Sequence, residues 1–407
     1  MSPLMIARLW IMVFLHYFVW GSWYVTISTY LTTTLKFTGT QTGAVFGTTA
    51  VAALVSPFFV GLIADRLFAT EKVLAALYAI GAVLVFAVTR VSSFPAVYAL
   101  MLLYCLSYFP TIALTNSLAM QQVRNVGQDF PPIRMMGTLG WILIGLAIGY
   151  MKVEATSTPF LMAAGASALM SLFSLTLLPH TPPRAKGEAV GVRDILGLDA
   201  LSMMKRPSFA VFIVASVLAC IPLTFYFSFT NDFLNDVGVQ NAAGKMTLGQ
   251  VSEVAMMLLM PLIFRWATVK YILIAGLLSW TVRYGLLAHG NAGSGMWMFY
   301  LAILLHGVCY DFFFMTGQLY TDQQAPAHLR SAAQGFITFI TYGIGMYAGS
   351  LISGNALDFF TTGTGAAAVR DWKHFWASSA LGALAILLIV ALLFRSKAHI
   401  EATPDAG

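Results

Sequence analysis

Charged residues are scarce in this sequence. Asp, Glu, Lys and Arg make up 9% of its 407 residues, whereas soluble domains carry about 25%. Hydrophobic residues make up 59% and aromatic residues 14%. This composition excludes an ordinary soluble protein, and it is typical of helices that cross a bilayer and pack closely against one another.

Cysteine and catalytic motifs are also nearly absent. Cys105, Cys220 and Cys309 each lie inside an apolar run, and none forms a C-x-x-C pair. We therefore expect three buried thiols, with no disulfide framework, no metal site and no cofactor. No H-E-x-x-H motif, glycine-rich phosphate loop or long polar domain is present, which argues against an enzyme or a receptor. The sequence contains no charged ring or filter-like repeat of the kind that would indicate an ion channel.

Twelve apolar runs are long enough to cross a bilayer, which takes roughly 20 residues per helix. In the first half of the chain they cover residues 5–33, 41–64, 72–90, 94–120, 132–151 and 157–178. In the second half they cover residues 208–234, 246–266, 270–288, 295–320, 331–355 and 373–394. The sequence therefore predicts an all-α membrane protein with twelve transmembrane helices in two six-helix halves, the organisation of a two-half transporter.

A polar, proline-bearing segment separates the two halves. We expect an N-terminal half over residues 1–178, a linker over 179–207, a C-terminal half over 208–395 and a tail over 396–407. Inside the linker, apolar residues at helical spacing predict a short helix lying on the membrane surface. These residues are Ile195, Leu198, Leu201 and Met204.

The basic residues predict the orientation. With the N-terminus inside, fifteen Lys and Arg residues fall on the cytoplasmic side and six fall outside, while Arg283 lies within the ninth span. This bias is the one that membrane proteins show. It places both termini and the linker in the cytoplasm, and it explains the net charge of +6 better than a nucleic-acid partner does.

The loop "GLIADRLFATEK" follows the second run. Its Gly61, Asp65 and Arg66 resemble the G-x-x-x-D-R signature loop of the major facilitator superfamily, although Phe68 stands where the signature has a later glycine. The resemblance implies a gating role, in which Asp65 meets a helix N-terminus or an arginine of the other half. The alternative is a solvated turn without such a role.

Two carboxyl groups lie within spans, where each charge costs about 2.5–3.5 kcal/mol on insertion scales. Glu253 follows Gln250 by three residues, so both side chains lie on one helical face. Asp311 stands between Tyr310 and Phe312, and so apolar a setting favours its protonated form. A carboxyl group that exchanges a proton near neutral pH is what proton coupling requires. The alternatives are helix–helix hydrogen bonds or a permanent ion pair.

The stretch "DFPPIRMMGTLGW" places an arginine at the start of the fifth span. Pro131 and Pro132 suit the first turn of a helix, so we expect Arg134 in that turn. Arg134, Thr138 and Trp141 then lie on one face. They would line a cavity with a cation, a hydroxyl and an aromatic ring. The alternative is that Arg134 anchors the helix at the lipid headgroups.

Aromatic and small polar residues recur in several spans. Thr224 and Phe227 belong to "IPLTFYFSFTNDF" in the seventh span, and His306 precedes Asp311 by five residues in the tenth. His306 borders the same cavity or is a packing residue. Bases stack on aromatic rings and sugar hydroxyls need acceptors such as carboxylates. Such a cavity indicates a nucleoside or a sugar as the transported solute.

At these residues the chain resembles the nucleoside:proton symporter family of the major facilitator superfamily. The matching stretches are "WGSW" at 20–23, "TLKFTG" at 34–39, "DFPPIR" with "GTLG" at 129–140, "LGLDA" at 196–200, "QVSE" at 250–253, "DFF" at 311–313 and "RSAAQG" at 330–335. The resemblance implies proton-driven nucleoside uptake across a bacterial inner membrane, with the nucleoside bound in a central cavity.

The resemblance also implies which residues form the site. Residues that match family site positions in type are Arg134, Thr138, Gln250, Glu253 and Asp311, and residues at cavity positions where relatives carry other aromatics are Trp141, His306 and Tyr310. Relatives carry amides near Thr224 and Phe227, which this chain lacks. We expect symport by a monomer through alternating access, with Asp311 and Glu253 as the proton-coupling residues. A sugar or nucleoside-like metabolite is the alternative cargo.

Overall fold

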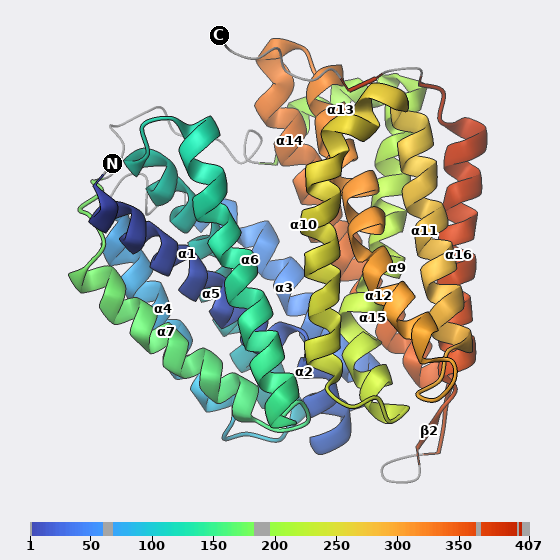
Figure 1. The fold of residues 1–407 in the computed structure, drawn as a ribbon, viewed down its shortest axis with the longest axis horizontal. Coiled ribbons are helices and arrows are strands. Elements are labelled where there is room, and N and C mark those ends of the chain that lie inside the picture. Colours follow the sequence, from blue (N-terminus) through green and yellow to red (C-terminus); the bar gives the residue numbers. More distant parts are fainter. Residues whose placement is uncertain (1, 60–67, 183–195, 364–367, 397–398, 401–407) are drawn as a thin grey trace. The chain divides into compact units, whose positions relative to one another are not determined.

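The computed structural model describes residues 2–59, 68–182, 196–363, 368–396 and 399–400 (Figure 1). The chain divides into two compact units. Unit 1 comprises residues 1–190 and 240–247, and unit 2 comprises residues 191–239 and 248–407. The predicted all-α membrane fold is confirmed. Eleven of the described helical segments are long and apolar enough to cross a membrane.

Unit 1 consists of helices α1 to α7. Their bounds are α1 Pro3–Tyr24, α2 Ile27–Thr29, a π-helical segment η1 Tyr30–Thr34, α3 Gly39–Phe59, α4 Thr70–Val88, α5 Phe94–Gln122, α6 Val126–Met151 and α7 Thr158–Thr176. In this unit α1 packs against α6 and α7, and α4 packs against α5 and α7. Helix α3 is not among the eleven spans, and the predicted second span runs past its end into residues outside the described part of the chain.

Helix α6 begins earlier than the sequence pattern predicts. Its N-cap is Asn125, whose side chain accepts from the Gln128 backbone N–H. The Asp129 carboxylate also accepts the backbone N–H groups of Arg124 and Asn125, at 3.2 and 3.1 Å. These capping bonds start the helix before the two prolines. The expectation that Arg134 lies in the first turn is therefore wrong, since it lies in the third.

Small residues let α6 approach α1 closely. A Cβ added at Gly137 would lie about 3.0 Å or less from the Tyr17 ring, and one at Gly140 would collide with the Phe14 backbone. Close backbone approach through glycine is the usual way that membrane helices pack. The "GTLG" stretch of the sequence is thus explained by packing.

Unit 2 consists of the remaining elements. Their bounds are a 3₁₀ helix η3 Leu198–Lys205, α9 Pro207–Asp236, α10 Ala242–Trp266, α11 Val269–His289, α12 Met296–Tyr310, a π-helical segment η4 Asp311–Met315, α13 Thr316–Gln324, a 3₁₀ turn η5 Ala327–Leu329, α14 Arg330–Thr338, a π-helical segment η6 Phe339–Gly345, α15 Met346–Phe359, β1 Thr361–Thr362, β2 Val369–Arg370 and α16 Trp372–Leu393. Helix α10 starts within the residues of unit 1. Helix α11 packs against α12 and α16, and α9 packs against α15 and α16.

The described part of the linker contains a short helix. Ile195 lies outside the described residues, and the described part is a 3₁₀ helix. Its buried residues are Ala200 and Met203, whereas Leu201 is 50% exposed. Gly197 has φ 63° and lies against the backbone of α14, where a Cβ would be 2.6 Å from the Phe336 nitrogen. Leu198, Leu201 and Met204 are three residues apart and therefore lie on one side of this 3₁₀ helix, away from the buried Ala200 and Met203. That this side lies on the membrane surface stays a prediction.

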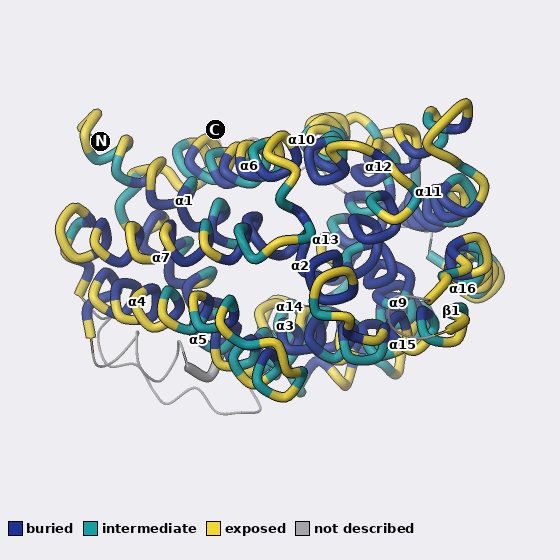
Figure 2. The backbone as a smooth tube through the Cα atoms, turned by 90° about the horizontal axis from the view of Figure 1, so that it is seen from below, coloured by how far each residue is buried: buried dark blue, intermediate teal, exposed yellow. Residues whose placement is uncertain are grey.

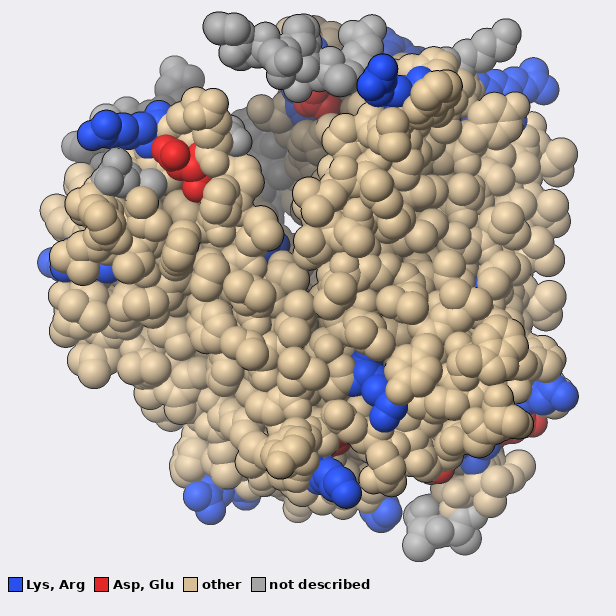
Figure 3. Space-filling model, in the orientation of Figure 1, with Lys and Arg blue, Asp and Glu red and all other residues tan. Residues whose placement is uncertain are grey.

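The surface agrees with a membrane environment. Helices α4 and α7 have a buried side and an exposed side along their length (Figure 2). On α7, Leu169, Leu172 and Leu175 are 53, 59 and 63% exposed. In Figure 3 most of the visible surface of unit 2 is uncharged, and most of the visible Lys and Arg side chains lie toward the top and bottom of the view. Apolar stripes of this extent are covered by lipid in a membrane protein.

Candidate functional site

On unit 1, the predicted Arg134 contacts an aromatic ring of α1. Its guanidinium carbon lies 4.3 Å from the centre of the Tyr17 ring, a cation–π contact worth about 0.5–2 kcal/mol. Gly137, one turn further along α6, leaves the room for Tyr17 to reach this position. Sequence reasoning missed Tyr17, which no motif marks.

Trp141 lies further along the same side of α6 and belongs to an aromatic cluster. Its ring is 5.6 Å from Trp20 and 6.0 Å from Tyr24, both in edge-on arrangement. Trp20 in turn contacts Phe109 of α5 at 5.7 Å. Thr138 is half-buried between Arg134 and Trp141 in the sequence of α6. Helices α1, α5 and α6 thus present a cation and a set of aromatic faces.

His16 of α1 is a buried polar residue next to this aromatic cluster. Nδ1 of His16 lies 2.5 Å from the Tyr78 hydroxyl, and the Tyr108 hydroxyl donates to the His16 carbonyl at 2.7 Å. The His16 ring stacks on Tyr108 at 5.2 Å. These bonds satisfy polar groups inside the bundle and fix the rotation of α1, so His16 has a structural role here.

On unit 2, Glu253 lies on α10 and faces α12. Its Oε2 atom is 3.8 Å from Nε2 of His306, and its side chain is 30% exposed. Gly307 brings the two helices together, since a Cβ there would lie 2.5 Å from the Ser252 carbonyl carbon and 2.7 Å from the Glu253 nitrogen. Ser252 Oγ also donates to the Leu304 carbonyl. The glycine next to His306 therefore positions Glu253 against the imidazole.

His306 is the centre of a buried cluster. Its Nδ1 atom lies 3.1 Å from Nη1 of Arg283, which is fully buried in α11. The imidazole stacks on Tyr226 at 5.4 Å and meets Phe227 edge-on at 5.8 Å. The guanidinium carbon of Arg283 lies 3.4 Å from the centre of the same Tyr226 ring. With Glu253 of α10, four helices thus contribute to this cluster.

Tyr310 and Asp311 follow on the next turn. The hydroxyl groups of Tyr310 and Tyr342 share a hydrogen bond, and the Tyr310 ring lies 6.0 Å from His306. Asp311 is 2% exposed and starts the π-helical segment η4. Its Oδ2 atom has no hydrogen-bond partner among the described residues. A π-helical turn inside an α-helix is frequent at functional sites, and an unpartnered buried carboxyl oxygen is a candidate for proton binding.

Thr224 and Gln250 were predicted for the site but take no part in the contacts described above. The Thr224 hydroxyl donates to carbonyl groups of its own helix, Cys220 at 3.1 Å and Ile221 at 2.7 Å, and it lies against Gly349 of α15. Gln250 is half-buried on α10, one turn before Glu253. The predicted gating residues Asp65 and Arg66 lie outside the described residues.

Sequence reasoning noted the position of Arg283 but gave it no role. The signal was available, because an arginine in the middle of a span is costly and faces a partner or a cavity. Its partner His306 was a candidate on its own. Tyr226 and Tyr342 carry no such signal, since tyrosines are common in this chain. Among the described residues, no group of three His, Cys, Asp or Glu side chains is placed to hold a metal ion.

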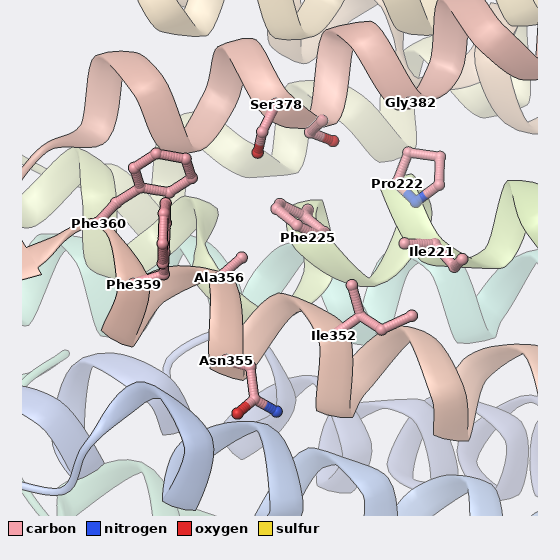
Figure 4. A pocket seen from close by; sticks show the side chains of 11 residues that line it. Ile221, Pro222, Phe225, Ile352, Asn355, Ala356, Phe359, Phe360, Ser378 and Gly382 are labelled. Carbon is pink, nitrogen blue, oxygen red and sulfur yellow. The ribbon is translucent and has the colours of Figure 1, made fainter.

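A separate groove of about 600 Å³ lies between α9, α15 and α16 (Figure 4). Its lining is mainly apolar and includes Ile221, Phe225 and Phe359. Two of its polar members are bonded within their own helices, Asn355 to the Leu351 carbonyl and Ser378 to the Phe375 carbonyl. The groove contains none of the predicted site residues, and its lining offers no charged group for recognition of a polar solute.

Comparison with known proteins gives matches over almost the whole chain. The family model described as Nucleoside H+ symporter matches residues 4–399. The chain is 39% identical to the putative nucleoside transporter YegT of Escherichia coli, covering 98% of this chain and 95% of that protein. It is 31% identical to the xanthosine permease of Escherichia coli, covering 95% of each. A crystal structure of the nucleoside transporter NupG is similar with a TM-score of 0.89 and 28% identity, covering 97% of this chain and 100% of that one.

Proposed function

Since the chain belongs to the nucleoside H+ symporter family, we propose that it imports nucleosides together with protons across a bacterial inner membrane. Two-half transporters open their site to one side of the membrane at a time. Residues 1–178 and 208–395 are the proposed halves, and a single chain is the proposed transporting unit. The excess of Lys and Arg on one side favours cytoplasmic termini and a cytoplasmic linker.

The unpartnered Oδ2 atom of Asp311 is the observation that carries proton coupling. An ionised carboxylate that is almost fully buried without a partner is costly, whereas its protonated form is tolerated. Proton binding at Asp311 therefore gives the carrier two states that differ in charge. Glu253, which is more exposed, stays accessible to the substrate and is the second candidate for the proton.

The aromatic and polar side chains of each unit support a nucleoside as the solute. On unit 1, Trp20 and Trp141 offer ring faces and edges to a base, and Arg134 offers N–H donors to its carbonyl oxygens. On unit 2, Glu253 offers acceptors to the ribose hydroxyls. Thr138, Gln250, Phe227 and Tyr310 complete the proposed set, and Thr224 acts through the packing of α9.

Uptake of labelled uridine and adenosine into cells that produce the protein tests this proposal. Uptake above that of cells with an empty vector, lost on addition of a protonophore, is the expected result. A panel of unlabelled nucleosides and sugars then competes with the label. Competition by sugars alone would instead favour the alternative cargo, and uptake that persists without a proton gradient would contradict coupling.

A further inference from the structure

Arg283 is a charged side chain with an unusual environment. It is fully buried in α11, and the described residues give it no carboxylate as an ion-pair partner. Its Nε and Nη2 atoms have no hydrogen-bond partner among those residues. The guanidinium lies against the Tyr226 ring face, and its Nη1 atom lies within hydrogen-bond distance of Nδ1 of His306. The imidazole nitrogen therefore receives a hydrogen bond from this guanidinium.

That contact determines the tautomer of His306. A guanidinium stays protonated in proteins and can only donate hydrogen bonds. Nδ1 of His306, 3.1 Å from Nη1, must therefore be the acceptor and carries no proton. In the neutral imidazole the proton then resides on Nε2. A doubly protonated ring would place N–H against N–H and two cations side by side in a buried site.

The protonated nitrogen faces Glu253. The 3.8 Å between Nε2 and Oε2 is too long for a direct hydrogen bond. The Glu253 side chain is 30% exposed, so a third group has access to it. A donor and an acceptor thus lie next to each other, and a hydroxyl group can use both at once, since it accepts from one and donates to the other.

We propose that Arg283 is a positioning residue that locks His306 as a permanent Nε2–H donor, and that His306 and Glu253 together bind one ribose hydroxyl of the substrate. This rests on the proposed function for the identity of the substrate. It assigns the coupled proton elsewhere, since His306 keeps one protonation state while the carrier works. It also implies that nucleosides lacking that hydroxyl bind more weakly.

The charged and titratable groups around His306 agree with a single protonation state of its imidazole. Arg283 from α11 opposes a second proton on the ring, and Tyr226 from α9 stacks on it. Glu253 from α10 is the one acidic neighbour within 4 Å among the described residues, and it faces the nitrogen that already carries the proton. Tyr310, on the same helix as His306, is hydrogen-bonded to Tyr342.

Nitrogen NMR of the full chain labelled with ¹⁵N-histidine tests the tautomer without any substrate. The signal of His306 is assigned by its loss in His306→Gln. We expect Nδ1 unprotonated and Nε2 protonated throughout pH ~5.5 to ~8, measured in steps across the range where histidine ordinarily titrates. A proton on Nδ1, or titration within this range, would overturn the proposal.

Variants of Arg283 separate positioning from packing. Arg283→Lys keeps a cationic donor and should keep the tautomer, whereas Arg283→Met should let His306 titrate. Arg90→Met removes an arginine that also lies over an aromatic ring, 4.7 Å from Phe86 in α4, and should leave the His306 signal unchanged. If Arg283→Met does not fold, the wild-type measurement and Arg283→Lys still decide the tautomer.

Equilibrium binding of uridine and its 2′-, 3′- and 5′-deoxy analogues tests the donor role. His306→Gln keeps an N–H donor at a similar reach and should bind uridine nearly as well as the wild type. His306→Phe should weaken binding by about tenfold, the effect of one lost hydrogen bond, and should no longer distinguish one of the analogues from uridine. Unchanged discrimination in His306→Phe would overturn the donor role, and absence of nucleoside binding by the wild type would instead reject the proposed function.

Discussion

Arg370 of strand β2 forms an ion pair with Asp232 near the end of α9, at 3.0 Å. The Asp232 side chain is 1% exposed and that of Arg370 15%. Two residues further on, the Trp372 indole donates to Asp236 at 2.6 Å. Asp371, between Arg370 and Trp372 in the sequence, is the N-cap of α16. The hydrogen bond that its carboxylate accepts from the His374 backbone N–H lowers the pKa of Asp371. The short hairpin is therefore tied to the end of α9 by a buried charge pair.

Breaking this pair from one side should be costly. Arg370→Met leaves the Asp232 carboxylate buried without its cation, and such changes destabilise by about 3–5 kcal/mol. The double variant Asp232→Leu with Arg370→Met removes both charges and should recover most of the loss. Thermal unfolding of the purified protein in detergent measures both. Lys373→Met, an exposed neighbouring residue, is the matched control, and equal melting temperatures for Arg370→Met and this control would contradict the prediction.

The contact between Arg134 and Tyr17 should contribute to substrate binding through the placement of the guanidinium. Tyr17→Phe keeps the ring face and should bind uridine as the wild type does. Tyr17→Leu removes the cation–π contact, worth about 0.5–2 kcal/mol, and should weaken binding by roughly 2- to 30-fold. Arg134→Gln should weaken binding at least as much. Binding by Tyr17→Leu equal to that of Tyr17→Phe would show that the ring does not position Arg134.

Asp311→Asn should still exchange uridine across the membrane but should no longer accumulate it. The amide imitates the protonated carboxyl group in shape and charge, so the carrier loses the charge difference that coupling needs. Exchange of labelled for unlabelled uridine should persist, while uptake against a gradient should be lost and should no longer depend on external pH. Asp322→Asn, on α13 of the same long helix, should leave accumulation intact. Full accumulation by Asp311→Asn would move the coupled proton to another group.

Glu154 caps the start of α10. Its Oε1 atom accepts the backbone N–H of Ala243 at 2.8 Å, and the side chain is 4% exposed. A charged acceptor on an otherwise unpaired helix N–H contributes about 1.5–3 kcal/mol. Glu154→Ala should lower the free energy of unfolding by about this amount, and with it the melting temperature in detergent. Glu154→Gln keeps a weaker acceptor and should fall in between, so a ranking with Gln below Ala would refute the capping role.

Much of the fold follows from the sequence because the bilayer restricts the possibilities. Only a helix satisfies every backbone group within one segment inside lipid, so the length of each apolar run nearly determines its structure. The start of α6 was predicted wrongly because capping by Asn125 and Asp129 extends the helix before Pro131. The docking of Gly197 onto α14 was not predicted, because packing of this kind is not contained in local periodicity.

Candidate residues for the site could be named from the sequence where a side chain is chemically out of place in a membrane. Glu253, Asp311 and His306 became candidates in this way, and the structure places Oε2 of Glu253 3.8 Å from Nε2 of His306. Their mutual geometry was not predictable, because it depends on Gly307 allowing α10 to approach α12. The contact of Arg283 with His306 was missed for the same reason, since the two residues lie 23 positions apart in the sequence.

Uptake of labelled uridine by the purified protein in liposomes, with a pH gradient imposed across the membrane, tests the central claim most directly. With the outside more acidic, the account predicts transient accumulation of uridine above its external concentration, abolished by a protonophore and absent in Asp311→Asn. Entry that only equilibrates uridine, at a rate indifferent to the gradient, would contradict it.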